Sequence, residues 1–351
     1  MKVIHIESGL GNQMLSYCEY LALKKVNPNE KFYIENIVFD IPECDTAICQ
    51  WNGYELDSLF GIQEPANIRT LFTAKEWDNI IREIRNSKFW EKNWNYPVYI
   101  TQALNHAGLS LKNVRGNFEN SSIINVSSFK KETFLSKLKE TKFAYILRRY
   151  YQQLRRNHYI QQKNRKHILF DHSADDLFTG QWLSFKYIGN NRELIDDEIK
   201  EAFVFPEFTD KQNKDMSDFL SSVNSVAIHA RRGDMLSVNG WCYKYGYFRR
   251  AVSYIRRHVD NPVFVFFTNT GSVEWCKENA KTFGLDYSKD KVYFVDWNKD
   301  KNSYRDMQLM GYCKHAIITN STFGWWGAYF ITNPQKITIS PLVEIDTTVH
   351  C

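Results

Sequence analysis

The sequence predicts an α/β protein of two domains, the second built on a doubly wound parallel sheet. Its 351 residues, 43% hydrophobic and 24% charged, are too many for one small core and too ordinary in composition for a disordered or fibrous chain. In the second half, short runs rich in Val, Ile and Phe alternate with amphipathic helical patterns. This alternation is typical of parallel sheets, because neighbouring parallel strands need a crossover that a helix supplies.

The first half begins with the same order of strand, turn and helix. The predicted elements are a strand over Val3–Ile6, a glycine turn over Ser8–Asn12, a helix from Gln13 to about Lys25 and a strand over Phe32–Ile34. From there to Asn120 the pattern is irregular and rich in aromatic residues. We therefore expect residues 1–190 to form an N-terminal α/β domain with irregular insertions.

Residues 191–351 carry the most regular pattern. Strands are predicted over Ser225–Ala230, Val263–Thr268, Val292–Asp296, Ala316–Thr319 and Lys336–Ser340. Helices are predicted between them, over Tyr247–His258, Val273–Phe283, Tyr304–Lys314 and Phe323–Ile331. The domain boundary is expected near Asn190–Asp197, just before this regular region.

The charge of the chain is nearly balanced, with 45 basic and 40 acidic residues and a net charge of +5, so it does not indicate nucleic-acid binding. The segment Arg148–Lys166 differs, because it contains seven basic residues and no acidic one. Three interpretations stay open. It is a solvated helix face, a peripheral contact with an anionic membrane or acceptor, or a nucleic-acid surface that uses its interleaved tyrosines.

Several catalytic motifs are missing from the sequence. There is no G-x-x-x-x-G-K-[ST] loop and no G-x-S-x-G elbow, which disfavours ATPases and serine hydrolases. No two aspartates are separated by one residue, and the seven cysteines form no C-x-x-C pair. We therefore expect no metal and no cofactor, with phosphate charge falling to arginine and helix dipoles.

The start of the chain, Met1–Glu7, runs into a glycine turn without the basic and apolar regions of a signal peptide. No window approaches the roughly 18 consecutive apolar residues that cross a bilayer as a helix. We expect a cytoplasmic protein that is at most peripherally associated with a membrane.

The segment His229–Asp234 closes a predicted buried strand with two adjacent arginines. Arginines are costly to desolvate unless they meet anions or carboxylates. In a doubly wound sheet this edge is where ligands bind. Either Arg232 and Asp234 form a structural pair, or one arginine is structural and the other contacts a phosphate.

Two further segments place helix starts after strands. In Asn320–Ala328, Ser321 or Thr322 is a natural N-cap, and the free N–H groups of such a helix end attract an anion. A plain capped helix is the alternative. Ser8–Gln13 is half of a dinucleotide fingerprint, with Met14 in place of the third glycine, and fits a tight turn that lets a ligand approach the backbone.

These segments together resemble the alpha-1,2-fucosyltransferases, glycosyltransferase family 11. The residues that carry the resemblance are Gly9–Met14, His229–Asp234, Asp306–Met310 running on to Cys313–His315, and Asn320–Ala328, with a degraded copy of a family segment at Gly180–Tyr187. The region from about 40 to 175 is not covered. One departure is Thr268–Gly271, which stands where the family commonly has acidic residues.

The resemblance implies two Rossmann-like domains facing across a cleft, the GT-B type, with the acceptor on the N-terminal side. It also implies a GDP-fucose donor, a β-galactoside acceptor, inversion at the anomeric carbon and independence from metals. The implied contacts are diphosphate binding by Arg231, guanosine binding by His229 and Asp306, donation to the phosphates by Ser321, Thr322 and Phe323, and a place near the sugar for Asn12.

The catalytic base stays open at this point. Asp234 is favoured beside Arg231, Glu7 competes with it, and a third alternative needs no dedicated side chain. Two other functions also stay open, a transferase of another GDP-sugar and a protein that binds nucleic acid or an anionic surface.

Overall fold

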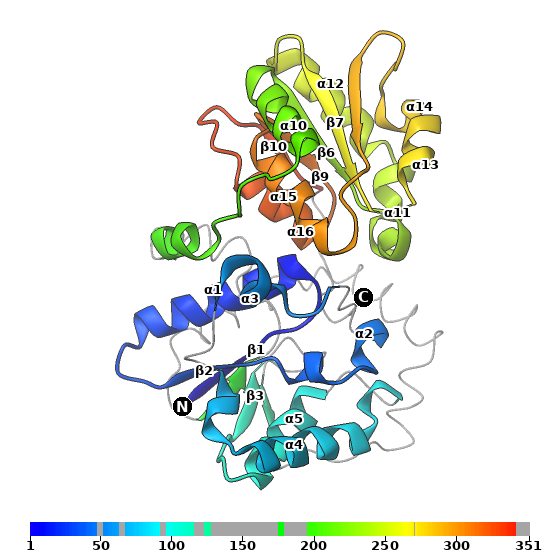
Figure 1. The fold of residues 1–351 in the computed structure, drawn as a ribbon. Helices are drawn as coiled ribbons and strands as arrows, with labels where there is room; N and C mark the ends of the chain where they lie inside the picture. Colours follow the sequence, from blue (N-terminus) through cyan, green and yellow to red (C-terminus); the bar gives the residue numbers. More distant parts are fainter. Residues whose placement is uncertain are drawn as a thin grey trace.

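The computed structural model describes residues 1–47, 52–62, 67–91, 96–115, 123–127, 175–178, 195–269 and 271–341. They form two α/β units, each around its own five-stranded sheet, stacked one above the other (Figure 1). The expected fold class is therefore confirmed. The proposed boundary at residues 190/191 and the basic segment Arg148–Lys166 lie outside the described residues, as does Gly180–Tyr187.

The first sheet has the order β2-β1-β5-β3-β4 and is parallel except for the β3–β4 pair. Its strands are β1 Lys2–His5, β2 Phe32–Glu35, β3 Asn113–Arg115, β4 Ile123–Asn125 and β5 Asp176–Phe178. The helices of this unit are α1 Leu10–Val26, α2 Cys44–Ala47, α3 Glu55–Phe60, α4 Ala74–Ser87 and α5 Tyr96–His106, with short 3-10 turns at Ile37–Asp40, Ile68–Leu71 and Phe89–Glu91.

Alternation along β1 divides the first core into two layers. Ile4 packs with α1 and α3 on one face, whereas Val3 packs with α4 and α5 on the other. Successive side chains of a strand point to opposite faces, so a fully buried strand needs helices on both.

The second sheet is wholly parallel, with the order β10-β9-β6-β7-β8. Its strands are β6 Ser225–Ala230, β7 Val263–Thr268, β8 Lys291–Val295, β9 His315–Ile318 and β10 Thr338–Ile339. Its helices are α10 Lys211–Ser222, α11 Leu236–Lys244, α12 Tyr247–His258, α13 Val273–Glu278, α14 Ala280–Phe283, α15 Tyr304–Gly311 and α16 Thr322–Tyr329, with 3-10 turns at Gly233–Met235 and Asp300–Asn302.

Most of the elements predicted for this unit are present. Three of them, β6, β7 and α12, begin and end at the predicted residues. The predicted helix Val273–Phe283 is wrong in one respect, because it breaks into α13 and α14 at Asn279. The side-chain Nδ2 of Asn279 donates to the Trp275 carbonyl over 2.8 Å. Asparagine competes in this way with the backbone hydrogen bonds of a helix interior.

The chain passes between the units through residues 203–210, after a helical stretch at 195–202 (Figure 1). Aromatic rings bridge the units there. Phe203 contacts Trp326 with ring centroids 5.3 Å apart, and Phe205 contacts Phe60 and Phe330, each at 5.2 Å. This cluster fixes α16 above α1 and α3.

Candidate functional site

The strand order of the second sheet reverses between β6 and β9, which is where ligands bind in open α/β sheets. Thr319 joins the carboxyl ends of these two strands. Its hydroxyl donates to the His229 carbonyl over 3.2 Å and accepts from the Arg231 N–H over 3.3 Å. The structure thus brings the two predicted motifs to one edge.

The two adjacent arginines have different environments. The guanidinium of Arg232 lies 3.4 Å from the ring centroid of Trp275 and 5.0 Å from that of Tyr243. The backbone N–H of Arg232 donates to Asn269 Oδ1 over 2.9 Å, so Asn269 supports this turn. Arg231 is half-buried, and its carbonyl accepts from the Tyr243 hydroxyl over 3.0 Å.

Asp234 lies in the 3-10 turn Gly233–Met235, directly after the arginines. Its side chain is outside the part of the chain that the structure describes. Pairing with Arg232 and the role of catalytic base therefore stay predictions.

His229 is a neutral, buried side chain at this edge. Burial, and secondly the charge of Arg231, lower its pKa to about 3. Its Nδ1 has no hydrogen-bond partner within the described ranges, and neither has the buried Nδ2 of Asn320. Orphaned buried polar atoms are rare in proteins and call for a ligand or a water.

The first turn of α16 packs against the side chain of His229. The rings of His229 and Phe323 stack with centroids 5.7 Å apart. A Cβ at Gly324 would lie 2.3 Å from His229 Nδ1, so only glycine allows this approach. The helix start is therefore packed directly onto the end of β6.

The N-terminus of α16 is not neutralised by side chains. Ser321 is the N-cap residue, as the sequence predicts, but its side chain makes no capping hydrogen bond, and the first turn holds no acidic residue. The first N–H groups of a helix lack partners within the helix and attract anions. An anion placed here would also meet the charge of Arg231.

The N-terminus of α1 meets that of α16 across the two units (Figure 1). The hydroxyl of Thr322 donates to Asn12 Oδ1 over 2.6 Å, and Trp326 Nε1 donates to the Gly11 carbonyl over 3.0 Å. Gly9, the N-cap of α1, has no side chain, and the Leu10 N–H at the start of this helix bonds to the Glu55 carboxylate. Asn12 and Thr322 thus hold the units together, and the uncapped start of α16 lies against the start of α1.

Asp306 belongs to a separate polar network at the start of α15. Asn298 Nδ2 donates to Asp306 Oδ1 over 2.8 Å, and Asn298 also bonds to Asn213. Burial raises the pKa of Asp306 to about 8.

Glu7 lies just past the carboxyl end of β1. Its Oε2 is 3.1 Å from His5 Nε2, and the other ring nitrogen of His5 bonds to Glu35. The residue is only 7% exposed. Sequence reasoning singled out Glu7 but missed His5 and Glu35, because nothing local indicates that β1 and β2 place them side by side.

Two supporting residues were also missed. Thr319 ends a predicted strand and gives no signal of its own. Asn239 in α11 accepts from the Asn320 N–H over 3.1 Å, across 81 positions of sequence. No pattern within a helix could have predicted that contact.

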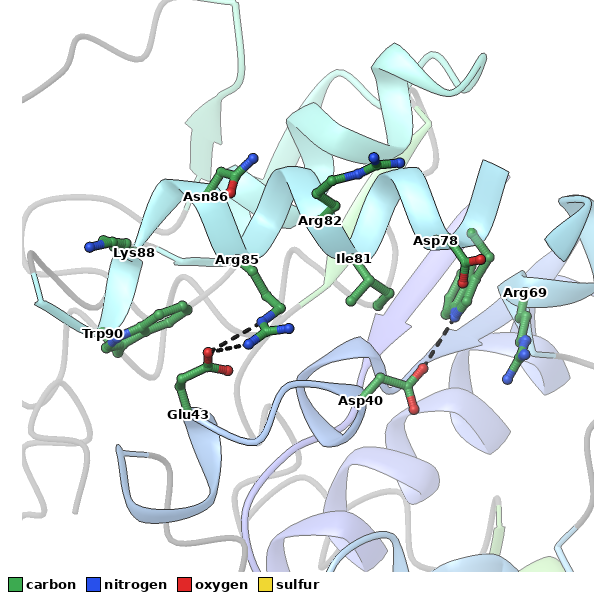
Figure 2. A pocket seen from close by; sticks show the side chains of 11 residues that line it. Asp40, Glu43, Arg69, Asp78, Ile81, Arg82, Arg85, Asn86, Lys88 and Trp90 are labelled. Carbon is green, nitrogen blue, oxygen red and sulfur yellow. Dashed lines mark hydrogen bonds and ion pairs between the residues drawn. The ribbon is translucent and has the colours of Figure 1, made fainter. Parts of the chain in front are cut away.

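A cavity of about 870 Å³ lies elsewhere, over α4 of the first unit (Figure 2). Arg85 binds Glu43 there through two hydrogen bonds of 3.2 and 2.5 Å, and Trp77 donates to Asp40 over 3.2 Å. These groups satisfy one another, so the edge near Arg231, with its orphaned atoms, is the stronger candidate site.

Within the described ranges, no three His, Cys, Asp or Glu side chains are arranged to hold a metal ion. No described helix is both long and apolar enough to span a membrane.

The sequence matches one family model and several individual proteins. The family model for glycosyl transferase family 11 matches residues 124–348. The chain is 32% identical over 171 residues to an alpha-1,2-colitosyltransferase of Escherichia coli, which covers 47% of this chain and 54% of that protein. It is 37% identical over 109 residues to galactoside alpha-(1,2)-fucosyltransferase 1 of Saimiri sciureus, covering 30% and 28%. The matches thus span about half, or less, of these relatives.

Two solved structures are similar at 10% identity. They are the fucosyltransferase NodZ from Bradyrhizobium, with a TM-score of 0.43 over 93% of this chain and 91% of that one, and POFUT1 in complex with GDP, with a TM-score of 0.40 over 97% and 98%.

Proposed function

Since the chain belongs to glycosyl transferase family 11, we propose that it transfers L-fucose from GDP-fucose to the 2-hydroxyl group of a terminal β-galactoside, with inversion at the anomeric carbon. The colitosyltransferase and the fucosyltransferase that resemble this chain are both named for an alpha-1,2 linkage, which supports that linkage here.

One observation carries the proposal. At the switch point of the second sheet, Arg231 lies beside the uncapped start of α16, and the buried Nδ2 of Asn320, directly before that helix, has no partner within the described residues. A nucleoside diphosphate offers what this edge lacks, a concentrated negative charge and hydrogen-bonding groups nearby.

The chemistry of transfer suits this arrangement. Breaking the bond between sugar and phosphate develops negative charge on the leaving diphosphate. Arg231 and the N–H groups of Ser321, Thr322 and Phe323 would stabilise that charge, and preorganised donors of this kind are each worth about 10²–10³ in rate. Because the Thr322 hydroxyl already donates to Asn12, the backbone N–H of Thr322 is the group available to bind phosphate.

The guanosine contacts are proposed for His229 and Asp306. Neutral His229 can bond without adding charge to the site. Burial raises the pKa of Asp306, and the N–H donors of guanine would favour its ionised form and lower its pKa on binding. Asn12, between the two helix ends, is proposed to lie near the sugar.

A second candidate is transfer of another sugar from a GDP donor. The identity of 32% to a colitosyltransferase favours it specifically. Colitose is L-fucose without its 3-hydroxyl group, so the choice rests on whether the sugar pocket hydrogen-bonds that hydroxyl. A site built to do so rejects the deoxy sugar by about 10⁴ or more.

The test is a competition. Purified protein is incubated with a β-galactoside and equal amounts of GDP-fucose and GDP-colitose, and products are identified by mass spectrometry and their anomeric configuration by NMR. We expect a fucosylated galactoside in the α configuration, as inversion of a β-linked donor requires. A colitosyl product in excess supports the second candidate, and no transfer from either donor contradicts both.

A further inference from the structure

Three ionisable side chains are buried together at the carboxyl end of the first sheet. His5 bonds through Nδ1 to Glu35 and through Nε2 to Glu7, the latter over 3.1 Å. The side chains of His5 and Glu35 are fully buried, and that of Glu7 is 9% exposed. Of the three, Glu7 alone reaches solvent.

The two carboxylates keep the imidazole charged. Burial by itself lowers the pKa of His5, but the charges and hydrogen bonds of Glu35 and Glu7 outweigh burial and raise it to about 10. Buried ion clusters contribute little to stability compared with apolar packing, so this one calls for another explanation.

The second oxygen of Glu35 is also occupied. Its Oε2 accepts from the Ile37 N–H over 3.0 Å, and the His5 ring contacts the edge of Tyr96 at 5.7 Å. These contacts within the first unit hold Glu35 and His5 in place. Glu7 is the partly exposed carboxylate of the three.

Glu7 directly precedes the turn that leads into α1, the helix whose start meets α16. Ser8 follows it with a left-handed φ of 63°, and Gly9 then caps α1. The first turn of α1 touches the first turn of α16, since a Cβ at Gly11 would lie 2.8 Å from the Phe323 nitrogen. Glu7 therefore lies on the first unit, at the edge that meets α16.

We propose that Glu7 is the catalytic base of the transfer, and that His5 and Glu35 are positioning residues for it. This inference rests on the proposed function. The acceptor oxygen forms the new bond to the anomeric carbon as the bond from that carbon to the β-phosphate oxygen breaks. The electron pair leaves with GDP, and the hydroxyl proton passes to Glu7 and later to solvent.

The requirement for inversion favours Glu7 over Asp234. An in-line displacement puts the attacking oxygen opposite the leaving phosphate. Asp234 is three residues from Arg231, on the unit proposed to bind the phosphate. Glu7 belongs to the facing unit, where the attacking hydroxyl has to be.

The test compares Glu7→Gln with Asp234→Asn and uses two acceptors. A galactoside must lose a proton to react, whereas azide is already an anion and attacks the donor without a base, giving fucosyl azide and GDP. We expect Glu7→Gln to lower kcat for the galactoside by about 10²–10⁴ while transfer to azide and GDP affinity stay near wild type.

Matched variants separate this role from a structural one. Glu19→Gln removes another buried glutamate of the same unit, within α1 and away from its N-terminus, and is expected to leave both rates unchanged. Glu35→Gln and His5→Asn should lower kcat for the galactoside less than Glu7→Gln does, without changing KM for GDP-fucose or the azide rate. Glu7→Asp, which keeps a carboxylate bonded near His5, should recover part of kcat.

The outcomes are distinct. Full galactoside transfer by Glu7→Gln, or equal losses with galactoside and azide in both Glu7→Gln and Glu7→Asp, overturns the assignment. Selective loss of galactoside transfer in Asp234→Asn alone assigns the base to Asp234 instead. Failure of the wild-type protein to bind GDP-fucose or transfer from it refutes the proposed function itself.

Discussion

Arg231 and Arg232 are neighbours in sequence but have separate tasks in the structure. Arg232 lies over the ring of Trp275, with Tyr243 beside it, so its guanidinium is part of the packing between β6 and α13. Arg231 sits at the strand end, where burial and, secondly, the charge of Arg231 lower the pKa of His229. Charge and chain position alone did not separate them.

We predict that substitution of Arg231 lowers activity, whereas substitution of Arg232 lowers stability. Arg231→Ala should lower kcat/KM by about 10²–10³, because it removes a donor to the leaving phosphate, while the free energy of unfolding changes little. Arg232→Ala should lower the free energy of unfolding by about 1–2 kcal/mol through lost cation–π contacts. Denaturant melts and turnover on both variants check this, and wild-type turnover in Arg231→Ala would contradict the phosphate assignment.

Among the elements, the helix starts decide how the units meet. Ser321 occupies the expected N-cap position without capping α16, and Thr322 turns its hydroxyl to α1 instead. Gly11 makes this possible, because the space its missing side chain leaves is filled by Thr322 and Phe323.

Gly11→Ala and Gly240→Ala should therefore change the free energy of unfolding in opposite directions. Both glycines are helical, and alanine is intrinsically favoured in a helix by about 1 kcal/mol. At Gly240 in α11 nothing lies within 4 Å of an added Cβ, so stability should rise. At Gly11 the Cβ would lie 2.7 Å from Thr322 Oγ1, and overpacking should lower stability by about 1–3 kcal/mol.

Chemical denaturation of both variants, together with GDP affinity, is the measurement. We expect weaker GDP binding in Gly11→Ala only, because its contact lies at the start of α16. Stabilisation of both variants by the same amount would show that α1 and α16 do not touch in solution.

At the scale of the whole molecule, aromatic contacts tie the units together where the chain crosses. Arg305 strengthens this crossing, since its guanidinium donates to the carbonyls of Pro206 and Glu207 and lies over the Phe208 ring. The crossing segment is thus fixed to α15. This explains part of the high aromatic content of the chain.

We also predict that transfer continues in excess EDTA. The sequence lacks an Asp-x-Asp pair, and Arg231 with the α16 start supplies positive charge for the diphosphate. Turnover with EDTA is compared with turnover after added Mg²⁺ or Mn²⁺. Loss of activity that either ion restores would contradict the prediction, whereas modest stimulation would agree with faster release of GDP.

The sequence by itself determined the fold class, most strands and helices of the second unit, and the two segments that meet at the carboxyl ends of β6 and β9. These follow from local patterns, because hydrophobic periodicity and the carboxyl ends of parallel strands are properties of short stretches. The break at Asn279 is an exception, decided by a side chain that competes with the helix backbone.

Only the tertiary structure decided which of these groups touch. Asn12 binds Thr322 across 310 positions, Arg232 lies on Trp275, and His5 joins Glu7 to Glu35 across two strands. Such contacts depend on how sheets and helices pack in space, and that packing is cooperative over the whole chain. No local pattern specifies it, so residue types could be predicted at the site while their partners could not.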